Sequence, residues 1–141
     1  MYSLPQEIEV WYIIPAVRSE IAKVLVSRGF TQDKASKILG VSKAAVSQYI
    51  SNKRASKVKF PKEVMSEIKK SVDNIIQENS VAVREIIRLL EIIKITKCSC
   101  NVCKIYNKGI LNLCNMEPVA MGEIGKAGNI SNVELLIKAN K

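Results

Sequence analysis

Residues 31–54 read TQDKASKILGVSKAAVSQYISNKR, and this stretch decides the fold. Thr31 and Ser42 are typical residues for the position before a helix, because a hydroxyl oxygen accepts a hydrogen bond from the first turn. Gly40 lies between them, and glycine tolerates the positive φ of a sharp reversal. Apolar residues recur at helical spacing on both sides of that glycine: Ala35, Ile38 and Leu39, then Val46, Tyr49 and Ile50. The stretch predicts two short helices joined by a tight turn.

Two helices in this arrangement form a helix-turn-helix, whose second helix enters the major groove of DNA. A small residue is needed where the helices cross, and Ala35 or Ser36 provides it. The second helix begins with small polar residues, which fit a groove about 12 Å wide. The residues expected to face the groove are Ser42, Lys43, Ala44, Ser47 and Gln48. The residues expected to contact phosphates, which fix register rather than sequence, are Gln32, Lys53, Arg54, Lys57 and Lys59.

Side-chain chemistry assigns a base to some of the groove-facing residues. Gln48 is expected to pair with adenine and Lys43 with guanine, while Ala44 is expected to contact a thymine methyl group. Lys43 is also compatible with a purely solvated position. Tyr49 is expected in the core rather than in the groove.

The stretch resembles the helix-turn-helix of lambda-repressor-like, XRE-type regulators. In that family the first helix starts with glutamine, the turn is Gly-Val or Gly-Ile, and the recognition helix holds a Val-Ser pair. Gln32, Gly40-Val41 and Val46-Ser47 match these features. The family usually has alanine where this sequence has Ser36, which is still small enough for close packing.

A longer run is similar to a family of archaeal transcriptional regulators. The similarity covers residues 5–54, including VWYIIPAVRSEIAKVLVSRG at 10–29. Members often carry a cysteine cluster near the C-terminus, and they often have a cysteine where this sequence has Gln6. The resemblance implies a DNA-binding regulator of archaeal origin.

The composition supports a polyanionic partner. The chain has 141 residues, with 22 Lys and Arg against 13 Asp and Glu, for a net charge of +9. Residues 1–72 hold 13 of the basic and 6 of the acidic residues, so the DNA-binding surface is expected in that half. Histidine is absent, which excludes Ser-His-Asp and Cys-His catalysis and histidine-ligated metals. No acid–base constellation is evident, and the chain is not expected to be an enzyme.

Apolar spacing predicts a mainly α-helical protein in three parts: an N-terminal lambda-repressor-like helix-turn-helix domain (1–60), a helical dimerisation segment (61–97) and a small cysteine-rich metal-binding segment (98–141). Pro15 is expected to interrupt the first helix and to open the next one, and Trp11 and Tyr12 are expected to pack as core. Residues 52–59 read as a basic connector with no apolar face. The helix near 81–96 is apolar around much of its circumference, which suggests a dimer interface or a central core helix. Glu85 and Glu91 are expected to form solvated ion pairs.

Four cysteines follow in the pattern C-x-C-x2-C-x10-C, and beyond the first of them the helical pattern fails. They are Cys98, Cys100, Cys103 and Cys114. Four thiolates in one short segment favour an iron–sulfur cluster, [4Fe-4S] or [2Fe-2S]. A structural zinc site is the alternative, and a metal-free redox pair of thiols is a third. Neighbouring lysines would lower thiolate pKa values or simply form a solvated face.

These features predict a sequence-specific transcription regulator whose DNA binding is modulated by an iron–sulfur cluster through redox or cluster sensing. The alternative is a DNA-binding interaction module with a structural four-cysteine zinc site. The expected partner is double-stranded DNA with a pseudo-palindromic operator, bound by a homodimer. No apolar run reaches the ~20 residues of a membrane span, and the start of the chain does not resemble a signal peptide, so a cytoplasmic location is expected.

Overall fold

The computed structural model describes residues 4–96 and 98–106, and every regular element in that part of the chain is helical. The mainly α-helical prediction is therefore confirmed there. The elements are α1 (Pro5–Ile8), the π-helix η1 (Glu9–Ile13), α2 (Ile14–Ser27), α3 (Gln32–Leu39), α4 (Lys43–Ile50), α5 (Lys62–Ile76), α6 (Ala82–Ile95) and α7 (Cys98–Tyr106). None of these helices is long and apolar enough to cross a membrane.

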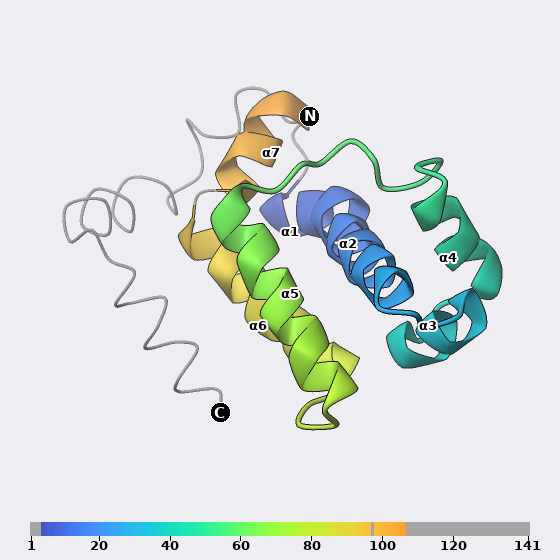
Figure 1. Ribbon diagram of the computed structural model, residues 1–141. Coiled ribbons are helices and arrows are strands. Elements are labelled where there is room, and N and C mark those ends of the chain that lie inside the picture. Colours follow the sequence, from blue (N-terminus) through green and yellow to red (C-terminus); the bar gives the residue numbers. More distant parts are fainter. Residues whose placement is uncertain (1–3, 97, 107–141) are drawn as a thin grey trace.

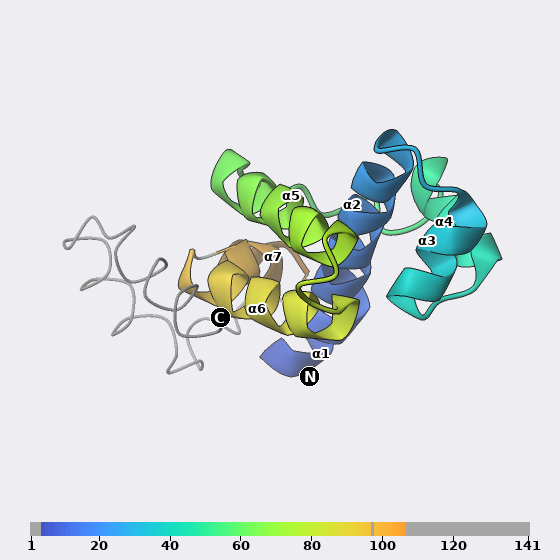
Figure 2. The same ribbon diagram turned by 60° about the horizontal axis from the view of Figure 1, so that its bottom comes forward.

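Helix α2 is the centre of the molecule. It lies between the α3–α4 pair on one side and the α5–α6 pair on the other (Figure 1), and a second view shows the same order (Figure 2). Its residues Val17, Ile21 and Leu25 are completely buried, as their helical spacing predicts. One cluster of buried side chains runs from Ile8 to Cys103. The helix-turn-helix therefore shares its core with α5, α6 and α7, while the three-part division of the chain stays a prediction.

The first helix does not break at Pro15. The chain is helical without interruption from α1 through η1 into α2, where Pro15 occupies the first turn. Pro15 thus stands at the start of α2, as predicted, and it has no N–H to donate to the preceding turn. The expected interruption is therefore replaced by a π-helical turn.

The π-helix explains why the prediction for Trp11 was wrong. Ile8 and Ile13, five residues apart, are both buried, as the i to i+5 spacing of a π-helix requires. Ordinary α-helical spacing would have turned Trp11 inward with Ile8. Instead Val10 is 58% and Trp11 56% exposed, whereas Tyr12 packs at the edge of the core.

The connector between α4 and α5 also differs from the prediction. It was expected to lack an apolar face, but Val58 is buried in the core, and Ala55 and Phe60 pack against it. Asn52 and Ala55 both have a positive φ of 58°. These two bends let a basic segment follow the surface while Val58 anchors it.

A buried ionic network joins α5 to α6. The guanidinium of Arg88 donates to Glu85 Oε2 at 3.1 Å, Glu67 Oε2 at 3.0 Å and Ser71 Oγ at 2.6 Å. Glu85 forms an ion pair as expected, but it is buried rather than solvated; Glu91 is exposed and lies 3.8 Å from Lys94. Burial alone would raise the pKa of Glu67, but hydrogen bonds and charge from Lys70 and Arg88 more than offset it, so its pKa is lowered.

Helix α6 has one buried apolar face and one exposed apolar face. Leu89, Ile92 and Ile93 are buried, which makes it a core helix. Val83 and Ile87 on the same helix are exposed, together with the preceding Val81. A dimer interface on this face of α6 stays a prediction.

The expected end of helical structure at the first cysteine was wrong. Residues Cys98–Tyr106 form α7, which packs on α1, η1 and α6. Cys98, Val102 and Cys103 on this helix are buried. Cysteine behaves here as a small hydrophobic residue, a property that a search for metal ligands overlooks.

Candidate nucleic-acid interface

The helix-turn-helix is fixed by local hydrogen bonds at each helix end. Thr31 Oγ1 accepts from the backbone N–H of Lys34 at 3.1 Å, and Ser42 Oγ accepts from that of Ala45 at 3.1 Å. Gly40 ends α3 with φ 67° and ψ 32°, in the left-handed region that favours glycine. Both predicted N-caps and the predicted turn are confirmed.

Close packing at the helix crossing is also confirmed. Ala35 is fully buried and Ser36 nearly so. The Ser36 hydroxyl donates to the Asp33 carbonyl at 2.6 Å, which satisfies its hydrogen-bonding group within its own helix. Val41 packs against the core beside them. A serine in place of the usual alanine is therefore accommodated.

Helix α4 separates a buried face from an exposed polar face. Ala45, Val46 and Tyr49 are buried against the rest of the domain. All the residues predicted to face the DNA groove are exposed: Ser42, Lys43, Ala44, Ser47 and Gln48. The exposed face carries three small side chains, one amide and one lysine, so the helix can approach base edges without a bulky apolar obstruction.

The predicted phosphate contacts flank this face. Lys53, Arg54, Lys57 and Lys59 are exposed along the connector that follows α4, and Gln32 is half-buried at the first position of α3. The Arg54 guanidinium lies 5.8 Å from the centre of the Tyr49 ring. This cation–π contact ties the connector to α4 and orients the charge.

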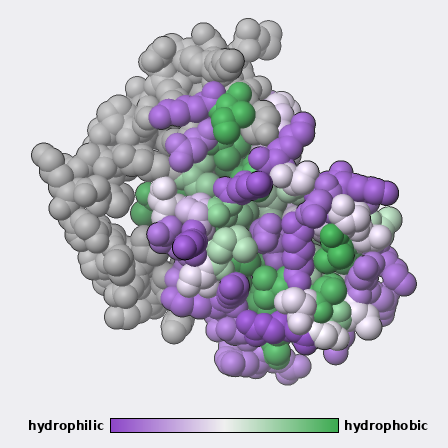
Figure 3. Space-filling model, turned by 45° about the horizontal axis from the view of Figure 1, so that its top comes forward, coloured by the Kyte–Doolittle hydropathy of each residue, from purple (hydrophilic) through white to green (hydrophobic). Residues whose placement is uncertain are grey.

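The surface agrees with a polar, cationic interface. Hydrophilic side chains cover much of the part of the molecule that carries the helix-turn-helix, with smaller hydrophobic patches between them (Figure 3). The connector reaches this surface directly from the C-terminus of α4. Base-reading and phosphate-binding groups therefore lie on consecutive segments of the chain.

Of the four predicted metal ligands, the structure places two. Cys98 and Cys103 are buried in α7; the side chain of Cys100 and the whole of Cys114 lie outside the described residues. Burial raises the pKa of the Cys98 thiol, whereas metal ligation requires the thiolate. Within 4–96 and 98–106, no three Cys, Asp or Glu side chains gather into a metal-binding group.

The helical geometry of α7 also separates the two buried cysteines. Five residues along an α-helix turn a side chain by about 140° at 100° per residue. Cys98 and Cys103 therefore leave α7 in different directions and do not converge on one ion while the helix is intact. Four sulfur donors suit iron–sulfur or zinc chemically, but the two thiols that the structure describes, Cys98 and Cys103, do not point to one ion in α7.

The structure also brings together residues that the sequence did not connect. A groove runs beside the basic connector and is lined on its other side by η1 and the start of α2. Trp11 and Tyr12 line it opposite Lys57. The available signal was the five-residue spacing of Ile8 and Ile13, which a search at α-helical period does not detect.

Residues 21–60 match the family model described as helix-turn-helix. This part of the chain is an XRE-like helix-turn-helix domain, and the match indicates a DNA-binding transcription regulator. The family is a DNA-binding domain and is not typically enzymatic. No curated protein and no solved structure matches the chain.

Proposed function

We propose that this protein binds specific DNA sequences through α4 and regulates transcription as a homodimer on a pseudo-palindromic operator. The observation that carries the proposal is the division of α4, with a buried apolar side and an exposed side of small and polar groups. Gln48 is the base reader with the most specific chemistry, because its amide can make two hydrogen bonds to adenine. Lys53, Arg54 and Lys57 supply the phosphate contacts that hold α4 in register.

Selection from a random DNA pool tests this proposal. Recovered sequences should contain two similar half-sites, with centres about 10 base pairs or one helical turn apart. Gln48→Ala should lose affinity for the selected DNA and retain its affinity for random DNA. Gln77→Ala, an exposed glutamine outside the helix-turn-helix, is the matched control. Enrichment of no sequence, or equal loss on selected and random DNA, would contradict base reading by α4.

The dimer is tested separately by sedimentation of the free protein and of its complex. A homodimer on DNA predicts a stoichiometry of two chains per selected site. The exposed Val83 and Ile87 of α6 are the natural candidates for the contact. Val83→Asp should lower the affinity for a two-half-site operator and leave the affinity for a single half-site unchanged. Arg84→Ala on the same helix serves as the control.

We also propose that the four cysteines ligate an iron–sulfur cluster, with structural zinc as the alternative. The support is their spacing and their soft sulfur donors. Because Cys98 and Cys103 do not converge in α7, binding requires this helix to unwind. Unwinding would affect the connector, since Cys98, Asn101 and Val102 line one groove with Lys57, Val58 and Lys59.

Metal content and spectra distinguish the alternatives. Protein purified without oxygen should show visible absorbance and contain matching amounts of iron and sulfide. A colourless protein with one zinc per chain would favour the interaction module. Helical content measured by circular dichroism should fall when the metal is restored. Cys98→Ser and Cys103→Ser should abolish metal binding, whereas unchanged metal content in both would remove these residues from the site.

A further inference from the structure

We infer that the groove between the basic connector and η1 binds a small planar anion of the nucleoside-phosphate class, which competes with DNA for the same cations. The groove has a volume of about 440 Å³. This lies within the 300–1,000 Å³ typical of small-molecule sites. Its lining residues are Val10, Trp11, Tyr12, Pro15, Lys53, Arg54, Ala55, Ser56, Lys57 and Val58.

The charge of the lining residues selects an anion. Three of them are cations, Lys53, Arg54 and Lys57, and no carboxylate is among the lining residues that the structure describes. All three cations are exposed, so each retains hydrogen-bond donors for a ligand. A phosphate group matches such donors better than a carboxylate does, because it offers more oxygens and a larger charge.

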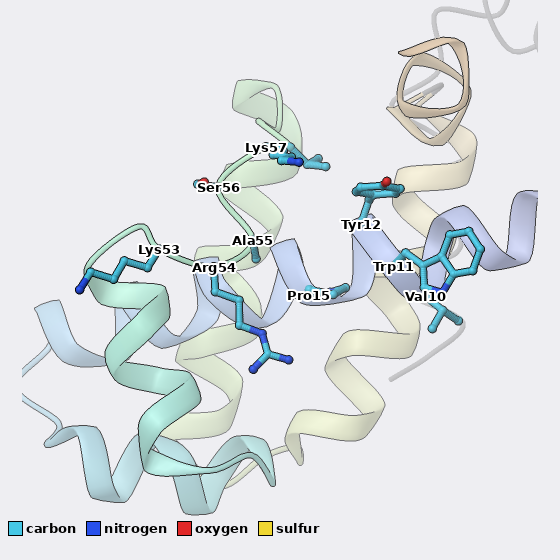
Figure 4. A pocket seen from close by; sticks show the side chains of 10 residues that line it. Val10, Trp11, Tyr12, Pro15, Lys53, Arg54, Ala55, Ser56 and Lys57 are labelled. Carbon is cyan, nitrogen blue, oxygen red and sulfur yellow. The ribbon is translucent and has the colours of Figure 1, made fainter. Parts of the chain in front are cut away.

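The apolar side of the groove selects a flat ring. Trp11 and Val10 lie at one end, Lys53 lies at the other, and Pro15 and Lys57 lie between them (Figure 4). Trp11 is 56% exposed, and it belongs to the π-helix η1 rather than to a loop. A phosphate alone would gain nothing from an indole, whereas a base can stack on it.

The same residues explain why the ligand would act on DNA binding. Lys53, Arg54 and Lys57 are also the proposed phosphate contacts, and this part of the inference rests on the proposed function. A ligand phosphate on these side chains removes them from the DNA. Arg54 is additionally held against Tyr49 of α4, so displacement of its guanidinium reaches the recognition helix.

The tryptophan makes the site directly measurable. The chain has one tryptophan, so its intrinsic fluorescence reports on this groove. AMP, adenosine and inorganic phosphate are titrated into the full-length protein without DNA. AMP should change the emission saturably, with an affinity at least tenfold above that of adenosine or phosphate alone. No saturable change with AMP, or equal binding of phosphate and AMP, would overturn the proposal.

Variants then locate the ligand and connect it to DNA. Calorimetry with AMP should show at least tenfold weaker binding for Trp11→Leu and for Lys57→Ala, and no change for Lys69→Ala, an exposed lysine on α5. Saturating AMP should weaken binding of selected DNA at least threefold in the natural protein and not in Trp11→Leu. Equal AMP affinity in all variants, or DNA binding unaffected by AMP, would overturn the proposal.

The result is separable from the proposed function. DNA binding is measured first, without AMP. If the protein binds no DNA, the helix-turn-helix proposal is contradicted, and the AMP site is then judged from the fluorescence titration alone. Emission that responds to duplex DNA and not to AMP would assign the groove to flanking DNA and overturn the small-ligand proposal.

Discussion

Arg88→Ala should be among the most destabilising substitutions on the α5–α6 pair. The guanidinium of Arg88 donates four hydrogen bonds. They go to the carboxylates of Glu67 and Glu85, to Ser71 Oγ, and at 3.3 Å to the backbone carbonyl of Glu67. Glu67 keeps Lys70 at 2.9 Å, and Glu85 keeps only Asn74 at 3.4 Å. Two buried carboxylates therefore remain with incomplete partners.

The magnitude follows from the partners that remain. Removing one member of a buried ion pair costs about 3–5 kcal/mol, because the other charge stays buried. Lys70 still compensates Glu67, so the lower end, about 3 kcal/mol, is expected. For a helical chain of this size that corresponds to a melting temperature lower by roughly 10–15 °C. Arg88→Lys retains one charge without the planar fork and should lose about half as much.

The pH dependence has a definite sign. The folded-state pKa of Glu67 is lowered, so its contribution is present above the unfolded-state pKa and is lost as pH falls through the folded-state pKa. In Arg88→Ala this carboxyl loses one of the cations that lower its pKa. The difference in unfolding free energy between natural protein and variant should therefore be largest near neutral pH and shrink in acid.

Urea unfolding followed by circular dichroism at neutral and acidic pH measures both effects. Arg84→Ala, four residues earlier on α6 and exposed, should change stability by no more than about 0.5 kcal/mol. A loss below about 1 kcal/mol for Arg88→Ala, or a difference that grows in acid, would refute the view that these carboxylates depend on Arg88.

Three further outcomes concern the DNA-binding half. Gln48→Ala should weaken binding of selected DNA by about 5- to 150-fold, equivalent to 1–3 kcal/mol, in fluorescence anisotropy; an effect below twofold would remove Gln48 from base recognition. Lys53→Ala with Lys57→Ala should reduce the slope of log affinity against log salt by about 2, and an unchanged slope would contradict phosphate contact. Gly40→Ala should cost about 1–2 kcal/mol in urea unfolding, because an added Cβ meets nothing within 4 Å and only the left-handed backbone is penalised. A neutral Gly40→Ala would show that the turn changes conformation freely.

The elements that could be predicted from the sequence are those fixed by neighbouring residues. Thr31, Gly40 and Ser42 act within one helical turn of themselves, so their roles in capping and in the turn could be inferred and are confirmed. The exposed residues of α4 followed from periodicity in the same way. Local hydrogen bonding and spacing are therefore sufficient for the helix-turn-helix itself.

The features that could not be predicted depend on contacts between segments distant in the sequence, or on the spacing of a π-helix. Glu85 was assigned to a solvated pair because its neighbours on α6 suggested one, but Glu67 and Ser71 of α5 complete a buried network around Arg88. Trp11 is expected in the core because it stands beside Ile13 and Ile14, but the π-helix leaves it exposed. Cys98 and Cys103 are buried in α7, which the sequence did not indicate, and their role as metal ligands stays a proposal.

The connector is where these unexpected features have a functional consequence. It carries the proposed phosphate contacts, and two grooves border it: one is lined by Trp11, and the other is lined by α7 with Cys98. Lys57 and Val58 line both grooves, and Val58 is anchored in the shared core. A ligand beside Trp11 and a change in α7 would therefore act on the same two side chains, Lys57 and Val58. Regulation through either groove then needs no movement of the helix-turn-helix as a body, only a shift of the segment that carries its positive charges to the DNA.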